Sequence, residues 1–225
     1  MQADSREIYS NQTGVHDNLE QVVLKHLRHP FLKPPADHTR QAFTAVSERI
    51  SAAPAPLILD SCCGTGVSSR QIALQHPDSW VIGLDRSAKR LDKEYEDALP
   101  DNLLMVQADC VDFWKLAVEA GWQLQKHYLL YPNPYPKSVQ LKYRWHGHPA
   151  FADLLRLGGL LEVRSNWQLY IEEFSQALKL AEQATEGCEV IDPAGQYLTL
   201  FERKYCQSGQ TVYRCLSTLS FGNAS

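Results

Sequence analysis

A short apolar strand that ends on a carboxylate and opens into a glycine turn constrains this chain most. Leu57–Asp60 is followed by Ser61-Cys62-Cys63-Gly64-Thr65-Gly66, and the apolar run 80–84 then ends on Asp85. In doubly wound α/β sheets the glycines let the backbone approach a nucleotide, and an acid about twenty residues later accepts the ribose hydroxyls. The pattern predicts a Rossmann-like fold with a nucleoside site at the carboxyl ends of its first strands.

The details of this turn favour one ligand over another. A dinucleotide site usually has a third small residue, most often glycine, at the position where this chain has Ser69. It does not usually place an acid at the end of the first strand, where Asp60 stands. A carboxylate there suits S-adenosylmethionine, which carries a sulfonium and an ammonium group. We therefore predict a site for this methyl donor, with Asp60 at its methionine end, Asp85 at its ribose and Asp109 at its adenine.

Composition predicts one cytoplasmic domain. The chain has 225 residues, a net charge of −4 and six cysteines that form no C-x-x-C pair. Its start lacks a secretory pattern, it has no apolar run long enough to span a membrane, and His146 and His148 lack further metal-ligand spacing, so we expect no signal peptide, no membrane segment and no metal. Residues 1–52 form a predicted helical prelude, and 55–220 form the predicted core.

Apolar periodicity gives the element order. Two helices, His16–His29 and Asp37–Ala52, come first. Strands are then predicted at 57–60, 80–84, 103–107, 127–131 and 159–164, with helices at 67–75, 87–97, 111–119, 149–156 and 168–185. The β-rich segments 197–205 and 211–220 predict a closing antiparallel hairpin. The expected fold is a doubly wound, mostly parallel seven-stranded sheet with a C-terminal hairpin.

Loops after the later strands should carry the methyl acceptor. The fourth strand is followed by Pro132-Asn133-Pro134-Tyr135-Pro136-Lys137, and the fifth by Ser165-Asn166-Trp167 with Tyr170 downstream. Thr199-Leu200-Phe201-Glu202 lies near the end of the chain. Each segment also has a purely structural interpretation, such as a turn at Asn133 or a helix N-cap at Asn166.

In order and spacing across roughly 55–220, these segments resemble the bacterial tRNA (guanine-N7-)-methyltransferases. That family has a Pro-Asp-Pro-Trp loop followed by Lys, a Thr-Asp-Trp segment, and a Thr-x-Phe-Glu segment near the end. The resemblance implies a methyltransferase that uses S-adenosylmethionine, bound by Asp60, Gly64, Gly66, Asp85 and Asp109, to modify a tRNA guanine. It implies that the acceptor loop supplies Asn133 and Tyr135 to catalysis, and that the substrate is held by Lys137, Asn166, Thr199, Phe201 and Glu202.

Two departures leave the acceptor open. Asn133 and Asn166 stand where the family has Asp, and the basic run after the loop is thinned to 138–144. Guanine N7 carries a lone pair and no proton, so its methylation requires positioning rather than a general base. An Asp can accept both the N1 and N2 hydrogens of guanine, whereas Asn loses one such bond at a cost of roughly 1–3 kcal/mol.

An alternative acceptor is another nucleobase or a small-molecule amine. The Asn133-Pro134-Tyr135 loop partly resembles the Asn/Asp-Pro-Pro-aromatic loop of amine methyltransferases, although the second proline is missing. A planar acceptor stacked on Tyr135 or Trp167 suits either interpretation. A non-catalytic homologue that binds tRNA or the methyl donor is the third possibility.

Overall fold

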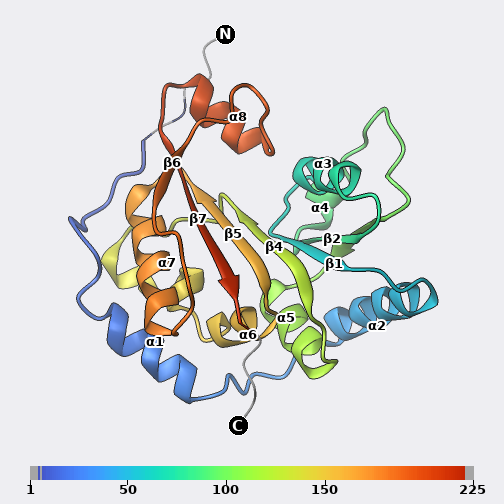
Figure 1. Cartoon of the computed structure of the whole chain (residues 1–225), viewed down its shortest axis with the longest axis horizontal. Coiled ribbons are helices and arrows are strands. Elements are labelled where there is room, and N and C mark those ends of the chain that lie inside the picture. The colour runs from blue at the N-terminus through green and yellow to red at the C-terminus, as the bar shows by residue number, and fades with distance from the viewer. Residues whose placement is uncertain (1–4, 6, 221–225) are drawn as a thin grey trace.

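The structure is a computed structural model that describes residue 5 and residues 7–220. Its centre is a seven-stranded sheet in the order β3-β2-β1-β4-β5-β7-β6 (Figure 1). The strands are β1 (Leu57–Ser61), β2 (Trp80–Asp85), β3 (Leu103–Gln107), β4 (Leu124–Leu130), β5 (Gly159–Ser165), β6 (Glu189–Ile191) and β7 (Val212–Leu219). Strands β1 to β5 pair in parallel, and β7 is antiparallel to both β5 and β6.

Helices pack on both faces of the sheet. They are α1 (Leu19–Arg28), α2 (Asp37–Ala52), α3 (Val67–Gln75), α4 (Ala88–Leu91), α5 (Cys110–Glu119), α6 (Phe151–Arg156), α7 (Gln168–Leu180) and α8 (Leu200–Gln207), with 3-10 turns η1 (Ser138–Tyr143) and η2 (Trp145–Gly147). The larger core contains residues of α1, α2, α5, α6 and α7. A smaller core lies under α3 and α8.

The burial of β1 explains its continuous apolar sequence. Leu57 and Leu59 enter the larger core, while Ile58 between them enters the smaller one. A strand covered on both faces favours consecutive apolar residues, as is usual in parallel sheets, and here these are 57–59. The predicted Rossmann-like, mostly parallel seven-stranded sheet is confirmed. Among the described helices, none combines the length and apolar character needed to cross a membrane.

The C-terminal antiparallel hairpin is present, but its first strand was predicted in the wrong place. The partner of β7 is β6 (Glu189–Ile191), whereas most of 197–205 lies in helix α8. Thr199 caps this helix, because its Oγ1 accepts a hydrogen bond of 2.9 Å from the Glu202 N–H. The Glu202 carboxylate in turn accepts from the Leu198 N–H at 2.7 Å. Thr-x-x-Glu is a capping-box pattern, and this local signal outweighs the β-rich composition.

Two predicted helices were too long. The helix predicted at 87–97 ends at Leu91, because Tyr95 turns back to the glycine turn and donates a 2.9 Å hydrogen bond to the Thr65 carbonyl. The helix predicted at 168–185 ends at Leu180. Thr185 beyond it bonds to the Leu216 carbonyl on β7 at 3.2 Å, so this segment follows the sheet edge.

Candidate functional site

The glycine turn after β1 is fixed by the acid that ends β2. The Gly64 N–H donates a 2.9 Å hydrogen bond to Asp85 Oδ2. Asp85 Oδ1 accepts from the Ser87 N–H at 2.8 Å and pairs with Arg90 at 3.1 Å. Gly64 and Gly66 have φ values of +62° and +80°, which strain any residue with a side chain. The structure therefore brings together three residues that the sequence placed in one site.

Asp60, at the end of β1, lies behind this turn and is fully buried. Its Oδ2 accepts hydrogen bonds of 2.6 Å from the hydroxyls of Ser68 and Ser69 on α3. Its Oδ1 is buried without a hydrogen-bond partner among the described residues. Burial raises the pKa of this carboxyl to about 6, against the lowering effect of the two hydroxyls. A nearby cation would favour its ionised form.

Asp109 follows β3 and begins α5. Its Oδ1 accepts a 2.9 Å hydrogen bond from the Val111 N–H, so it is a helix N-cap, and its side chain is half-buried. Cys110 beside it lies 3.8 Å, sulfur to sulfur, from Cys62 in the glycine turn. The predicted adenine position is therefore next to the turn that is predicted to hold the rest of the nucleoside.

The residues around the glycine turn fit a cationic nucleoside. An added Cβ at Gly64 would meet no atom within 4 Å, so space beside the turn is open. Asp85 Oδ2 accepts one hydrogen bond from the Gly64 N–H, which leaves lone-pair capacity for a ribose hydroxyl. The unpartnered Oδ1 of Asp60 supplies negative charge behind the turn. These residues could hold S-adenosylmethionine, and their individual roles stay predictions.

The loop after β4 presents the acceptor-side residues to solvent. Asn133 and Lys137 are exposed, and Tyr135 is half-buried. Asn133 Oδ1 accepts from the Tyr135 N–H at 3.4 Å, which forms a local turn. Tyr131 and Tyr135 on either side have φ values of +53° and +47°. Aromatic residues rarely adopt this left-handed conformation, so surrounding contacts must hold the loop.

Glu202 accepts hydrogen bonds from three separate segments of the chain. Its carboxylate is fully buried and accepts from the Tyr131 hydroxyl at 2.8 Å and from Arg164 at 2.7 Å, besides the Leu198 N–H. It joins α8 to the ends of β4 and β5. Its predicted contact with substrate stays a prediction, because the described contacts all go to the protein itself. Sequence reasoning missed Tyr131 and Arg164, which carry no local motif.

The other predicted substrate residues lie around α8. Phe201 is 54% exposed and stacks on Tyr205 with ring centroids 6.2 Å apart. Asn166 Nδ2 donates a 2.8 Å hydrogen bond to Gln210 Oε1 in the turn after α8. Thr199 is the N-cap residue of the helix. Figure 1 shows α8 at the end of the sheet where β5 finishes.

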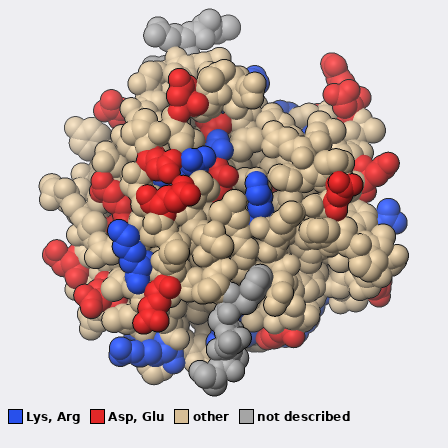
Figure 2. Space-filling view, in the orientation of Figure 1, with Lys and Arg blue, Asp and Glu red and all other residues tan. Residues whose placement is uncertain are grey.

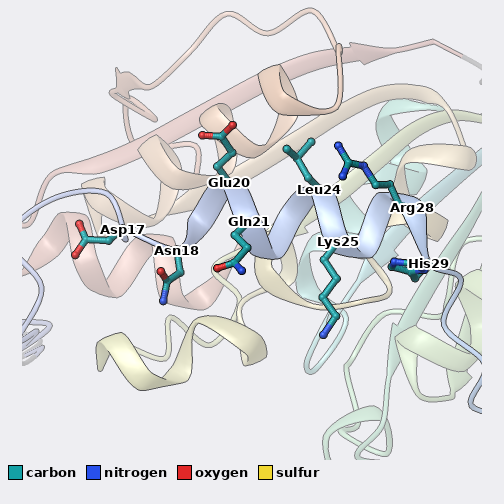
Figure 3. A pocket seen from close by; sticks show the side chains of 8 residues that line it. All are labelled: Asp17, Asn18, Glu20, Gln21, Leu24, Lys25, Arg28 and His29. Atoms are coloured by element: carbon teal, nitrogen blue, oxygen red, sulfur yellow. The ribbon is translucent and has the colours of Figure 1, made fainter.

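A separate surface hollow of about 540 Å³ lies along α1 (Figure 3). Its lining comes from one helix and the residues beside it: Asp17, Asn18, Glu20, Gln21, Leu24, Lys25, Arg28 and His29. In Figure 1, α1 lies at the opposite end of the molecule from α8. It also lies away from α3, the helix that follows the glycine turn, so the hollow is remote from that turn. Within the described ranges, no group of three or more His, Cys, Asp or Glu could hold a metal ion.

Solved structures share this fold. The 16S rRNA methyltransferase KamB superposes with a TM-score of 0.59 and 17% identity, covering 84% of this chain and 96% of that one. An antibiotic-related methyltransferase has a TM-score of 0.58 and 12% identity, covering 79% of this chain and 94% of that one. At these identities the likeness concerns the fold alone.

Curated relatives are more specific. The tRNA (guanine-N(7)-)-methyltransferase of Photobacterium profundum is 26% identical over 170 residues, which cover 71% of this chain and 69% of the relative. The enzymes of the same name from Treponema pallidum (strain Nichols) and Alkaliphilus metalliredigens are 26% and 25% identical, with 72% and 73% of this chain and 66% and 82% of theirs covered. The chain thus spans about two thirds of the length of the first relatives.

A family model described as "Putative methyltransferase" matches residues 54–215, which include the glycine turn, the Asn133 loop and α8. The match takes in most of the chain. The protein therefore belongs to this methyltransferase family.

Proposed function

We propose that the protein transfers a methyl group from S-adenosylmethionine to a ring nitrogen of a tRNA guanine, in the cytoplasm where tRNA resides. One observation carries the proposal: β1, which carries Asp60, lies between β2 and β4 in the sheet, and these strands are parallel. The glycine turn and the Asn133 loop therefore open at the same edge, so a donor at the turn would lie next to an acceptor at the loop. The names of the curated relatives support guanine N7 as the acceptor.

The reaction is a direct displacement. The N7 lone pair forms a bond to the methyl carbon while the carbon–sulfur bond breaks, and the electron pair of that bond stays on sulfur. No proton leaves N7, so the protein only has to orient the two substrates with N7, the methyl carbon and the sulfur in line. Asn133 would face the guanine edge, Tyr135 would stack on its ring, and Lys137 would contact the nucleic-acid backbone.

A second acceptor class is favoured by two observations. The loop carries an amide at Asn133, and the stretch 138–144 after it has only two basic residues, Lys142 and Arg144. On the one face that Figure 2 shows, acidic and basic side chains are interspersed. Nucleic-acid binders commonly concentrate Lys and Arg on one face. The second candidate is therefore an N-methyltransferase that acts on another nucleobase or on a small amine. The Asn133 side-chain carbonyl would accept hydrogen bonds from the N–H groups of that acceptor.

Product analysis tests the proposal. Purified protein is incubated with S-adenosylmethionine and unmodified tRNA transcripts, and nucleosides are analysed by mass spectrometry. We expect N7-methylguanosine at one site. Absence of that product contradicts the guanine proposal, and methyl turnover on an RNase-treated metabolite extract would then assign the second candidate. Donor binding by calorimetry without turnover on either substrate would identify a binding protein.

A further inference from the structure

Arg144 is a fully buried arginine whose guanidinium binds the main chain of the acceptor loop. Its Nε–H donates a 3.1 Å hydrogen bond to the Tyr135 carbonyl, and Nη2 donates to the Lys137 carbonyl at 3.3 Å. Both acceptors are main-chain groups. The contacts therefore define the path of the loop, whatever side chains it carries.

The guanidinium is itself held rigidly. Nη1 forms a buried ion pair with Glu173 Oε2 on α7, and the guanidinium carbon lies 4.9 Å from the centre of the Trp167 ring. His146 Nε2 lies 3.0 Å from the same carboxylate oxygen. Burial opposes ionisation of Glu173, but hydrogen bonds and attraction from His146 and Arg144 outweigh it and hold the pKa of Glu173 at about 2. Arg144 is thus paired with a carboxylate throughout the physiological pH range.

The N-terminal strap, residues 10–16, completes this support. Gln12 Oε1 accepts a 3.1 Å hydrogen bond from Arg144 Nη2, and Gln12 Nε2 donates to Glu173. Ser10 Oγ donates to the Pro136 carbonyl at 2.6 Å, and Asn11 Oδ1 accepts from the Ser138 N–H at 2.9 Å. The N-terminal strap thus fixes the end of the acceptor loop at Pro136 and Ser138, although the two segments are more than 120 residues apart in sequence.

The loop needs such support because Tyr135 is left-handed, with φ of +47°. A residue with a side chain keeps this conformation only where its surroundings enforce it. Arg144 binds the carbonyl of that same residue. The guanidinium therefore compensates for the unfavourable backbone geometry at the point where the loop turns toward the acceptor.

We propose that Arg144, steadied by Gln12 and Glu173, is a positioning residue for methyl transfer that holds the Asn133–Lys137 loop in its acceptor-binding geometry. The catalytic part rests on the proposed function. Displacement at a methyl group depends on alignment of the reacting atoms, and small misplacements reduce the rate steeply. The donor half of the site lies after β1 and β2, apart from these contacts, so donor binding should not depend on Arg144.

The test variant is Arg144→Lys, which keeps a positive charge opposite Glu173 but removes the planar fork that reaches two carbonyls. Gln12→Ala is the second variant, since it leaves the buried ion pair intact. The matched control is Arg156→Lys, which changes the same residue type in a surface pair with Asp153. For each, kcat on tRNA, calorimetric affinity for S-adenosylmethionine, and hydrogen exchange of the peptide 131–143 are measured.

We expect kcat in Arg144→Lys to fall between about tenfold and a hundredfold, with donor affinity unchanged within about twofold and faster exchange confined to 131–143. Gln12→Ala should show the same pattern more weakly, and Arg156→Lys should show none of it. Unchanged loop exchange in both variants, or a loss of donor affinity parallel to kcat, would overturn the proposal. If Arg144→Lys does not fold, Gln12→Ala decides. If the wild-type chain methylates no tRNA, the proposed function fails, and loop exchange still decides whether Arg144 positions the loop.

Discussion

Replacing Asn133 with Asp is the sharpest probe of the acceptor. Asn133 is exposed, and its one described side-chain contact is the 3.4 Å bond that Oδ1 accepts from the Tyr135 N–H. An Asp keeps that acceptor, so the turn should persist. The second oxygen then replaces the NH₂ group. A guanine that presents its N1 and N2 hydrogens to residue 133 would gain a second, charge-assisted acceptor.

The structure sets the size of the effect. A charge-assisted hydrogen bond contributes roughly 1–3 kcal/mol, with the upper values found where water is excluded. Asn133 is exposed in the described structure, so we expect the lower end, about 1–1.5 kcal/mol. That corresponds to a gain of roughly five- to tenfold in kcat/KM for guanine in tRNA.

Initial rates of N7-methylguanosine formation, followed by mass spectrometry, measure this gain. Asn18→Asp is the matched control, because Asn18 is exposed at the start of α1, makes no side-chain cap hydrogen bond there, and is not among the predicted site residues. An equal gain in the control would mean that charge alone is responsible. A fall of about tenfold or more on guanine, or a gain on amine substrates, would refute the reasoning.

Perturbations at three further residues, Asp60, Glu173 and Gly66, test the rest of the structure. Burial raises the pKa of Asp60 to about 6, so its charge is lost as pH falls through that value; S-adenosylmethionine affinity by calorimetry should fall roughly tenfold from pH 7 to pH 5, and Asp60→Asn should remove this dependence. Glu173, with a pKa of about 2, stabilises the fold by about 3 kcal/mol above its ordinary pKa of 4.5 and loses this as pH falls from 4.5 to 2. Glu173→Gln leaves Arg144 buried without a counter-charge and should cost about 3–5 kcal/mol in urea unfolding at pH 7. Gly66→Ala would force a residue with a side chain into a φ of +80°, while the flexible Met105 methyl, 2.5 Å from the new Cβ, can move aside; because of the backbone strain, the melting temperature and the donor affinity of the variant should both fall.

The sheet could be predicted because its signals are local. Each of β1 and β2 is buried at every position, and a fully buried strand reads as an unbroken apolar run. The glycine turn and Asp85 follow from spacing alone. The position of β6 could not be predicted in this way, because Glu189–Ile191 is three residues long and is defined by its pairing with β7. The stretch 197–205 is β-rich in composition, yet the Thr199 N-cap begins a helix that takes in most of it.

The support of the acceptor loop could not be predicted for a different reason. Arg144 contacts Gln12, which is 132 positions away, and Glu173, which is 29 positions away. No periodicity or spacing links such residues. A lone Arg after a thinned basic run reads as a surface cation, whereas the folded chain buries it completely. A charged residue is usually exposed to solvent, but it can be buried where the fold supplies a partner of opposite charge, and the sequence does not reveal that partner.

Both ends of the acceptor loop are therefore determined by residues outside it. At the entry, left-handed Tyr131 is anchored through its hydroxyl to Glu202, and at the exit, left-handed Tyr135 is anchored through its carbonyl to Arg144. Each left-handed residue costs about 1–2 kcal/mol, which these buried contacts must offset. A loop held at both ends presents residue 133 in one orientation. The choice between amide and carboxylate at that position then changes the chemistry offered to the acceptor while the geometry stays the same, and this is why a single substitution there can separate the two acceptor classes.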